Sequence, residues 1–262
     1  MAELNPFARI LALPNDSRAK TLAMAFAVSA VCSLAVSFGA VVLQPMIEAN
    51  RAAERQARLD ALIERLPGLT ALLAESAADT METLSLDLAT LEPVDEEPPE
   101  PIAAIADPDA SNPIPPEQDL AALGRRPNAA TIHVLRDGDA VEMVILPVMG
   151  RGYQSIIQGF LALGGDLNTI AALTITRQGE TPGLGARIEE ADWQALWPGT
   201  ELRDAEGTLR VSVVRGGATN EYEVDGITGA TRTSNGIQNM IRFWVGPEGY
   251  GPLLDALAEG SL

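Results

Sequence analysis

Residues 225–236 (DGITGATRTSNG) are the part of this sequence best suited to chemistry, because they are small and rich in hydroxyl groups. They lead into apolar residues at helical spacing, namely Ile237, Met240, Ile241 and Trp244. Thr233 or Ser234 is placed to cap that helix. The N–H groups at a helix N-terminus favour a phosphate. The segment therefore predicts either an anion site or an ordinary capped helix after a turn, and the residues alone leave both open.

A second unusual segment, residues 180–185 (ETPGLG), directly follows a predicted strand. Its proline and glycines favour a tight irregular path, and glycine lets a backbone approach a flat ligand closely. Leu184 is suited to lie against a ring face, while Glu180 and Thr181 offer polar contacts. Taken alone, an ordinary loop is the simpler interpretation.

The composition excludes several classes of function. Acidic residues number 36 against 18 basic ones, for a formal net charge of −18, which argues against a nucleic-acid partner. Cys32 and His133 are the single residues of their types, so this chain alone holds no disulfide framework, zinc cluster or Cys-ligated iron–sulfur centre. His133 lies in an alternating, strand-like run, which argues against a Ser-His-Asp triad. We therefore expect any chemistry at this chain to depend on a bound cofactor.

Residues 21–43 contain no charged side chain and follow Arg18 and Lys20. As a helix they would extend about 34 Å at about 1.5 Å per residue, enough to cross a bilayer. A cleaved signal peptide is the weaker alternative, because the apolar run is long and no A-x-A site follows it. A lipoprotein signal ending at Cys32 has a poor processing site. We therefore expect a single transmembrane anchor, whose orientation the flanking positive charges do not decide.

Between the anchor and the main domain the sequence predicts two different regions. Residues 44–91 carry apolar residues at helical spacing, in stretches at 47–66 and 69–91, and predict a helical juxtamembrane region. Residues 92–125 begin with a stretch, 92–117, that holds eight prolines and eight acidic residues but no lysine or arginine. Such a composition favours a solvated linker, or a loop wrapped over a partner.

The globular domain is expected at residues 126–250, followed by a C-terminal tail at 251–262. Alternating hydropathy and turn residues predict strands at 131–136, 140–147, 155–163, 169–177, 208–214 and 221–224. Helical patterns are short or late, at 192–196 and 234–244. The predicted fold class is therefore α+β, with a single N-terminal transmembrane helix followed by a mostly antiparallel sheet.

The two chemical segments together resemble the flavinylation motif of the FMN-binding domains. The likeness rests on Thr228-Gly229-Ala230-Thr231-x-Thr233, on Asp225 three positions earlier, and on the ETPGLG loop. It extends through residues 150–152, 159–163, 193–197 and 233–238, and through most of residues 14–66. This set is similar to the C subunit of the sodium-translocating NADH:quinone oxidoreductases.

The resemblance implies FMN bound covalently, as a phosphoester, to the hydroxyl of Thr231. It implies further cofactor contacts at Tyr153, Glu180, Thr181, Leu184, Gly185, Thr228, Gly229, Ala230 and Thr233. A separate flavin transferase would form the bond and recognise a motif that includes Asp225. The chain would carry no catalytic residue of its own. It would relay electrons as one subunit of a multi-subunit NADH:quinone oxidoreductase, without complete activity alone.

The resemblance also implies a location and partners. Residues 1–20 would form a cytoplasmic tail, and the flavin domain would lie on the periplasmic side of the inner membrane. Membrane lipid and the other membrane subunits of the complex would be its partners. The acidic composition, with few cationic groups near the ring, is expected to disfavour extra negative charge on reduction. The alternatives are the homologous subunit of the ferredoxin:NAD ion-translocating complex and a cofactor-free membrane adaptor.

Overall fold

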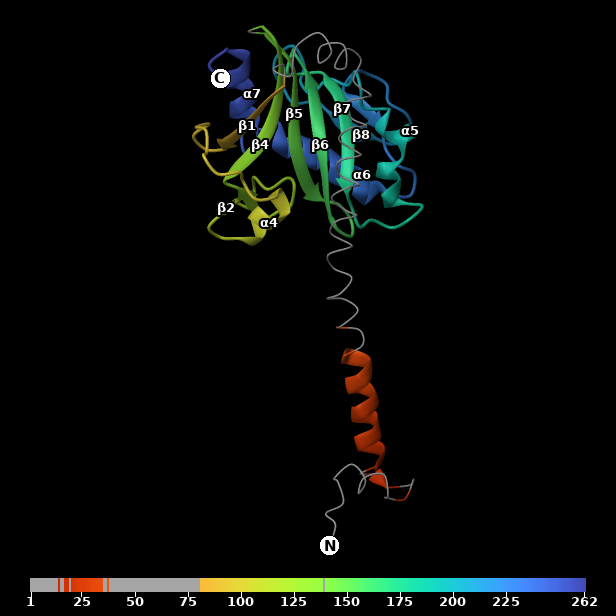
Figure 1. Ribbon diagram of the computed structural model, residues 1–262. Helices are drawn as coiled ribbons and strands as arrows, with labels where there is room; N and C mark the ends of the chain where they lie inside the picture. The colour runs from red at the N-terminus through yellow and green to blue at the C-terminus, as the bar shows by residue number, and fades with distance from the viewer. Residues whose placement is uncertain (1–13, 15–16, 19, 35–36, 38–80, 139) are drawn as a thin grey trace. The chain divides into compact units, whose positions relative to one another are not determined.

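The computed structural model describes residues 14, 17–18, 20–34, 37, 81–138 and 140–262 (Figure 1). They fall into two compact units, one within residues 1–56 and the other within residues 57–262.

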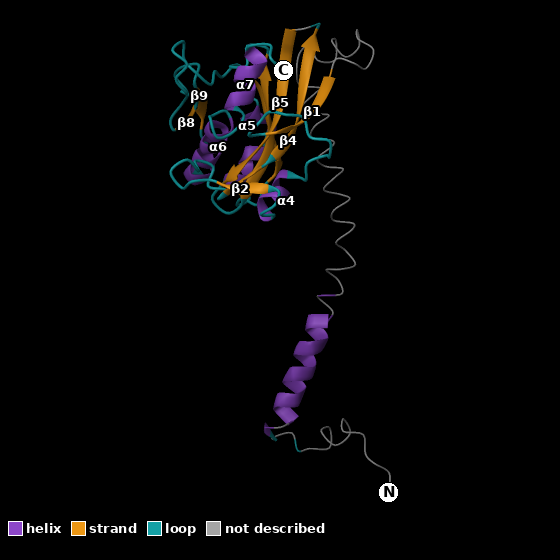
Figure 2. Ribbon diagram, turned by 90° about the vertical axis from the view of Figure 1, so that its left-hand side faces the viewer, coloured by secondary structure: helices purple, strands orange, loops and turns teal. Residues whose placement is uncertain are grey.

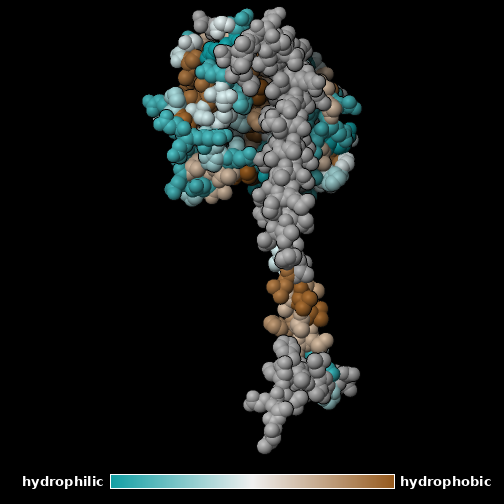
Figure 3. Space-filling model, in the orientation of Figure 1, coloured by the Kyte–Doolittle hydropathy of each residue, from teal (hydrophilic) through white to brown (hydrophobic). Residues whose placement is uncertain are grey.

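In the first unit, residues 20–34 are helical and their large apolar side chains are exposed (Figure 3). The described part of the chain includes no helix that is both long and apolar enough to span a membrane. The rest of the expected anchor, residues 35–36 and 38–43, lies outside the described residues, as does the expected helix at 47–66. The transmembrane anchor therefore stays a prediction.

The second unit is built on a five-stranded sheet in the order β1-β4-β5-β6-β7, in which every pairing is antiparallel (Figures 1 and 2). Its four later strands are β4 (Ala129–Asp137), β5 (Ala140–Arg151), β6 (Ile156–Gly164) and β7 (Ile170–Arg177). Both hairpins predicted from alternating hydropathy are confirmed, and so is the mostly antiparallel α+β domain. The β5–β6 turn reaches the functional site described below.

The first strand lies where a helix is expected, over residues 69–91. That expectation is wrong for residues 81–91. β1 (Met81–Asp87) pairs with β4 along its whole length. Leu86 and Leu88 are buried, and the hydroxyls of Ser85 and Thr131 lie 2.9 Å apart across the pair. A partner strand that lies far along the chain decides this structure, and local apolar spacing does not reveal it.

The acidic, proline-rich segment is folded, so the expectation of a solvated linker over residues 92–125 is wrong. It contains α4 (Pro101–Ala106) and β2 (Ser111–Pro113), and β2 pairs with β3 (Arg125–Pro127). Three of its apolar residues, Ala104, Ile114 and Ala121, are buried.

Arg125, the last residue of this segment, and the adjacent Arg126 hold it in place. The guanidinium of Arg125 donates to the hydroxyl of Ser111 at 2.8 Å and to the carbonyl of Pro108 at 3.1 Å. Arg126 donates to the carbonyl of Glu248 at 2.7 Å. The globular domain therefore includes residues 81–125 and does not begin at residue 126.

The principal helix, α6 (Thr231–Trp244), packs against β5, as Figures 1 and 2 show. The indole N–H of Trp244 donates to the carbonyl of Met149 at 2.6 Å, and the hydroxyl of Tyr250 donates to the carbonyl of Pro147 at 2.8 Å. These two bonds fix the C-terminal end of α6 and the following turn to β5.

The expectation of a C-terminal tail at residues 251–262 is also wrong, because these residues contain a packed helix. α7 (Gly251–Ala258) buries Leu253, Leu254 and Leu257 in the main core. The remaining elements are the 3-10 helix η1 (Gly185–Glu189), α5 (Ala191–Gln194), β8 (Ser212–Val214) and β9 (Glu223–Asp225). β8 and β9 pair in parallel, which the sequence pattern did not predict.

Candidate functional site

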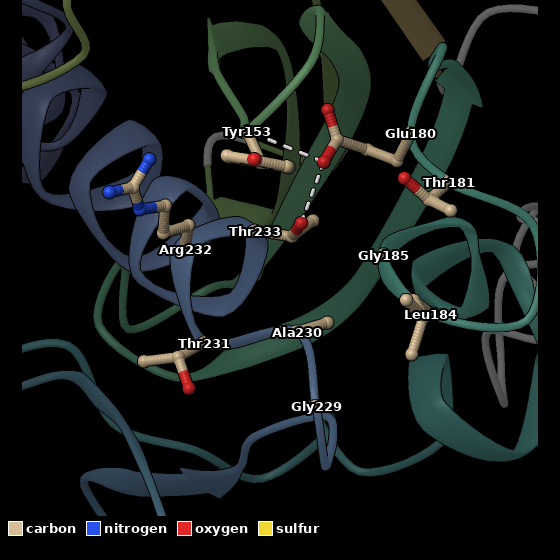
Figure 4. A pocket seen from close by; sticks show the side chains of 10 residues that line it. All are labelled: Tyr153, Glu180, Thr181, Leu184, Gly185, Gly229, Ala230, Thr231, Arg232 and Thr233. Atoms are coloured by element: carbon tan, nitrogen blue, oxygen red, sulfur yellow. Dashed lines mark hydrogen bonds between the residues drawn. The ribbon is translucent and has the colours of Figure 1, made fainter.

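The two segments singled out by sequence form the walls of one pocket with a volume of about 320 Å³ (Figure 4). The volume falls in the usual range of small-molecule sites. The pocket is lined by Tyr153, Glu180, Thr181, Leu184, Gly185, Gly229, Ala230, Thr231, Arg232 and Thr233. The fold thus brings together the ETPGLG loop, the start of α6 and the β5–β6 turn.

Glu180 is the buried centre of this arrangement, with 4% of its surface exposed. The hydroxyl of Thr233 donates to its Oε2 at 2.6 Å, and the N–H of Tyr153 donates to the same oxygen at 3.1 Å. The N–H groups of Gln154 and Ser155 donate to Oε1 at 2.9 and 3.1 Å. Burial alone would raise the pKa of Glu180, but the hydrogen bonds outweigh it and lower the pKa below its usual range. The carboxylate of Glu180 therefore connects three chain segments, and both of its oxygens already accept hydrogen bonds from the protein.

Glycines make room for this carboxylate. A Cβ at Gly152 would lie 2.6 Å from Oε1 of Glu180, and a Cβ at Gly185 would lie 2.5 Å from Oγ1 of Thr233. Sequence reasoning assigned the glycines of the loop to close ligand approach. For Gly185, which is buried, the packing of the protein itself already requires glycine.

The two motifs touch at Gly229. Its φ of 81° lies in the left-handed region that favours glycine, and a Cβ there would lie 3.2 Å from Cδ2 of Leu184. Leu184 is 45% exposed, so much of its side chain remains open at the pocket.

The cap of α6 differs from the sequence prediction. The helix begins at Thr231 with Ala230 as its N-cap and no side-chain capping bond, so the prediction that Thr233 or Ser234 caps it is wrong. Both hydroxyls turn inward: Thr233 bonds Glu180, and the hydroxyl of Ser234 accepts the N–H of Ile227 at 3.1 Å.

The start of α6 consequently presents free backbone donors. Within the described residues, the N–H groups of Thr231, Arg232 and Thr233 have no hydrogen-bond acceptor, while the N–H of Ser234 bonds the carbonyl of Ala230 at 3.0 Å. Such N–H groups and the positive end of the helix dipole favour an anion.

Arg215 and Arg232 are the functional candidates that sequence reasoning missed. Nη2 of Arg215 donates to Oγ1 of Thr231 at 2.6 Å. The guanidinium of Arg232 lies 5.2 Å from the ring centre of Tyr153. Two arginines therefore lie at a site where the sequence predicts few cationic groups near the ring. Two features of the sequence could have indicated these arginines. Arg232 occupies the unspecified position of the motif between Thr231 and Thr233, and Arg215 directly precedes the turn residues Gly216 and Gly217.

Two expected site residues do not line the pocket. Thr228 is exposed beside it. Asp225, in β9, accepts a hydrogen bond from the N–H of Ala218, and its carbonyl accepts the indole N–H of Trp193 at 2.9 Å. Asp225 thus supports the turn that carries Arg215.

The single histidine, His133, does not line the pocket. Nδ1 of His133 lies 3.1 Å from the hydroxyl of Thr83 between β4 and β1, and burial lowers the pKa of His133. The described residues also contain no group of three or more histidine, cysteine or acidic side chains that could hold a metal ion.

The pocket lies within a region that matches a known domain family. The family model described as FMN-binding domain matches residues 152–246, which include every residue that lines the pocket. The C subunit of the Na(+)-translocating NADH-quinone reductase of Vibrio alginolyticus is 36% identical over 260 residues, covering 96% of this chain and 100% of the relative. The corresponding protein of Pseudomonas aeruginosa is 35% identical and covers 94% and 98%.

The chain belongs to the family of the C subunits of the Na(+)-translocating NADH-quinone reductases. Solved structures of this family share its fold. The crystal structure of Shewanella oneidensis NqrC aligns with a TM-score of 0.67 at 28% identity and covers 79% of this chain and 99% of that one. The C subunit from Parabacteroides distasonis aligns with a TM-score of 0.54 at 20% identity, covers 79% and 94%, and supports the fold alone.

Proposed function

We propose that this chain is the electron-relay subunit of a sodium-translocating NADH:quinone reductase and carries FMN covalently bound, through its phosphate, to the hydroxyl of Thr231. The observation that carries the proposal is the position of that hydroxyl. Thr231 is the first residue of α6 and lines the pocket, and its hydroxyl accepts a hydrogen bond from Arg215. The attachment point and the pocket thus lie together within the region that matches the FMN-binding domain.

The surroundings of Thr231 suit a phosphate. The N–H groups of Arg232 and Thr233 point from the start of the helix, and the guanidinium of Arg215 lies within 2.6 Å of the hydroxyl oxygen. A phosphodiester carries negative charge, and both kinds of donor stabilise such a charge. Arg215 would neutralise the phosphate, and Asp225 would hold the turn on which Arg215 stands.

The rest of the pocket suits a flat aromatic ring. Leu184 and Tyr153 present exposed apolar surface from opposite sides in Figure 4, and their exposed fractions are 45% and 54%. We propose that both side chains contact the ring and that Thr181 lies at its polar edge. Glu180, which is fully hydrogen-bonded within the protein, would position these segments. FMN, when bound, supplies the electron-transfer chemistry, and its phosphate linkage leaves the ring unaltered.

The location and the partners are parts of the same proposal. Residues 21–43 would anchor the chain once across the inner membrane, with the flavin domain on the periplasmic side. The exposed apolar side chains of residues 20–34 support contact with lipid. A flavin transferase would recognise the motif that includes Asp225 and attach the cofactor. The other membrane subunits would supply the binding of NADH and quinone.

Replacement of the attachment residue tests the proposal. Thr231→Ala, expressed with a flavin transferase, should lose all flavin that resists denaturation, because no hydroxyl remains to form the phosphoester. The fold should change little, since the substitution removes one partly exposed hydroxyl. In-gel fluorescence of the denatured protein measures the attached flavin.

Thr228→Ala and Thr233→Ala are the matched controls. Both should retain attached flavin, although Thr233→Ala should lower stability because it removes the bond to Glu180. Undiminished fluorescence in Thr231→Ala would show that the attachment lies elsewhere. A wild-type protein without any attached flavin would favour the cofactor-free adaptor instead.

A further inference from the structure

An arginine and an aromatic ring meet at the side of the pocket that faces Leu184. The guanidinium carbon of Arg232 lies 5.2 Å from the ring centre of Tyr153, and both side chains line the pocket. Figure 4 shows the side chain of Arg232 leaving the first turn of α6 on the same side of the pocket as Tyr153. No carboxylate forms an ion pair with Arg232 among the described residues.

The fold does not depend on this pair. Arg232 is exposed and Tyr153 is 54% exposed, and exposed cation–π pairs contribute only about 0.5–1 kcal/mol. Both side chains line the pocket that a ligand would fill. A guanidinium is planar and weakly hydrated, so it stacks well on aromatic rings. The pair is therefore better suited to a ligand ring than to stabilising the domain.

The charges around the pocket single out Arg232. Glu180 and Arg232 are the charged residues of the pocket lining, and the carboxylate of Glu180 is engaged by hydrogen bonds from four residues. Arg215 lies at Thr231, where a phosphate would neutralise it. Arg232 is thus the cation left to face the ring.

The large negative charge of the whole chain does not cancel this local effect. The formal charge of −18 is spread over the sequence, and salt screens exposed charges beyond about 8 Å at physiological ionic strength. A cation in the pocket wall acts over a shorter distance, so its effect on a ligand charge dominates.

We infer that Arg232, supported by the ring of Tyr153, raises the midpoint potential of the flavin in this pocket. The inference rests on the function proposed above. Reduction adds an electron to the ring, supplied in a titration by an electrode. When no proton accompanies that electron, the ring gains one negative charge, which the guanidinium stabilises. Without the arginine, the one-electron reduction equilibrium should become about tenfold less favourable, a fall of about 59 mV.

Spectroelectrochemical titration of the full-length, covalently flavinylated protein tests this inference. Arg232→Gln should lower the midpoint potential by that amount, whereas Arg232→Lys should keep most of the wild-type value because it keeps the charge. Tyr153→Leu should lower the potential in part, since it keeps an apolar wall but removes the support of the guanidinium. Flavin attachment should persist in all three variants, because Thr231 is unchanged.

Arg187→Gln is the control for net charge. Arg187 is an exposed arginine paired with Glu190 at 3.0 Å, and it does not line the pocket. Its loss changes the chain by the same charge and should leave the potential unchanged. A wild-type potential in Arg232→Gln would overturn the inference, as would an equal shift in Arg187→Gln or an equal fall in Arg232→Lys.

The same samples separate this inference from the proposed function. A wild-type protein that carries no flavin after denaturation overturns both. Flavinylated variants with an unchanged potential overturn the role of Arg232 alone and leave the attachment at Thr231 in place.

Discussion

Glu180 is the residue on which the shape of the pocket depends most. Its carboxylate receives the hydroxyl of Thr233 from α6 and the N–H groups of Tyr153, Gln154 and Ser155 from the β5–β6 turn. It is itself part of the ETPGLG loop, so one ionised group fixes three segments. The hydrogen bonds favour its charged form and offset the cost of burial.

Glu180→Gln should therefore destabilise the domain at neutral pH by about 1–3 kcal/mol, because an amide offers one acceptor oxygen and leaves buried donors unpaired. The folded-state pKa of Glu180 lies below its ordinary value of 4.5. Its contribution is thus fully present above pH 4.5 and is lost as pH falls further, through the folded-state pKa. Urea unfolding of both proteins from pH 7 to pH 3 should show their difference shrink below pH 4.5.

Glu142→Gln is the control for that experiment, since Glu142 is an exposed carboxylate of β5. It should match the wild type at neutral pH. Equal stability of Glu180→Gln and the wild type at pH 7 would show that the carboxylate of Glu180 does not hold the three segments together.

For single residues, the sequence predicts which of them line the pocket better than it predicts what each of them does there. Thr231, Leu184, Gly185 and Gly229 could be assigned from their motifs, and the structure brings them together. The role of Glu180 could not be assigned, because it depends on Thr233, 53 residues further along the chain. Arg215 was missed for the same reason, since its contact with Thr231 spans 16 residues.

Among the elements, α6 and β5 form the contact that positions the attachment residue. The helix crosses the end of the strand so closely that side chains are excluded at two points. A Cβ at Gly236 would lie 2.6 Å from the carbonyl oxygen of Arg151, and a Cβ at Gly150 would lie 2.7 Å from Cβ of Met240. The first of these contacts lies within the first two turns of α6, close to Thr231.

Gly236→Ala should push the start of α6 away from β5. We expect a loss of about 1–3 kcal/mol from overpacking, even though alanine is a better helix former than glycine by about 1 kcal/mol. The yield of attached flavin should also fall, because Thr231 moves relative to Arg215 and the pocket. Urea unfolding and in-gel flavin fluorescence measure the two effects.

Asn235→Ala, an exposed neighbour on the same helix, is the control and should retain both stability and flavin. If Gly236→Ala proved more stable than the wild type, helix propensity would outweigh the contact and the close packing would be refuted.

Element prediction succeeded where the pattern is local. The two hairpins of β4 to β7 and the C-terminal end of α6 at Trp244 follow from alternation, turn residues and helical spacing. α6 begins at Thr231, earlier than the pattern predicts, because Ala230 caps it without a side-chain bond. The sequence pattern of β1 predicts a helix, because only its pairing with β4 makes it a strand.

For the whole molecule, the position of the domain boundary makes a direct prediction. Deleting residues 1–44 should give a protein that is soluble without detergent, because no comparable apolar run follows. Deleting residues 1–125 should not, since it removes β1, α4 and β2 and leaves β4 as an exposed edge strand. Size-exclusion chromatography and thermal unfolding compare the two. Equal stability of both truncations would restore the boundary at residue 126 that composition suggested.

The central claim, one FMN attached by a phosphoester at Thr231, is tested most directly by intact-mass spectrometry of the protein purified from its native host. We predict an added mass equal to FMN less one water, carried after proteolysis by the peptide that contains Thr231 and absent from Thr231→Ala. An unmodified mass for the native protein, or the same added mass in Thr231→Ala, would contradict the account.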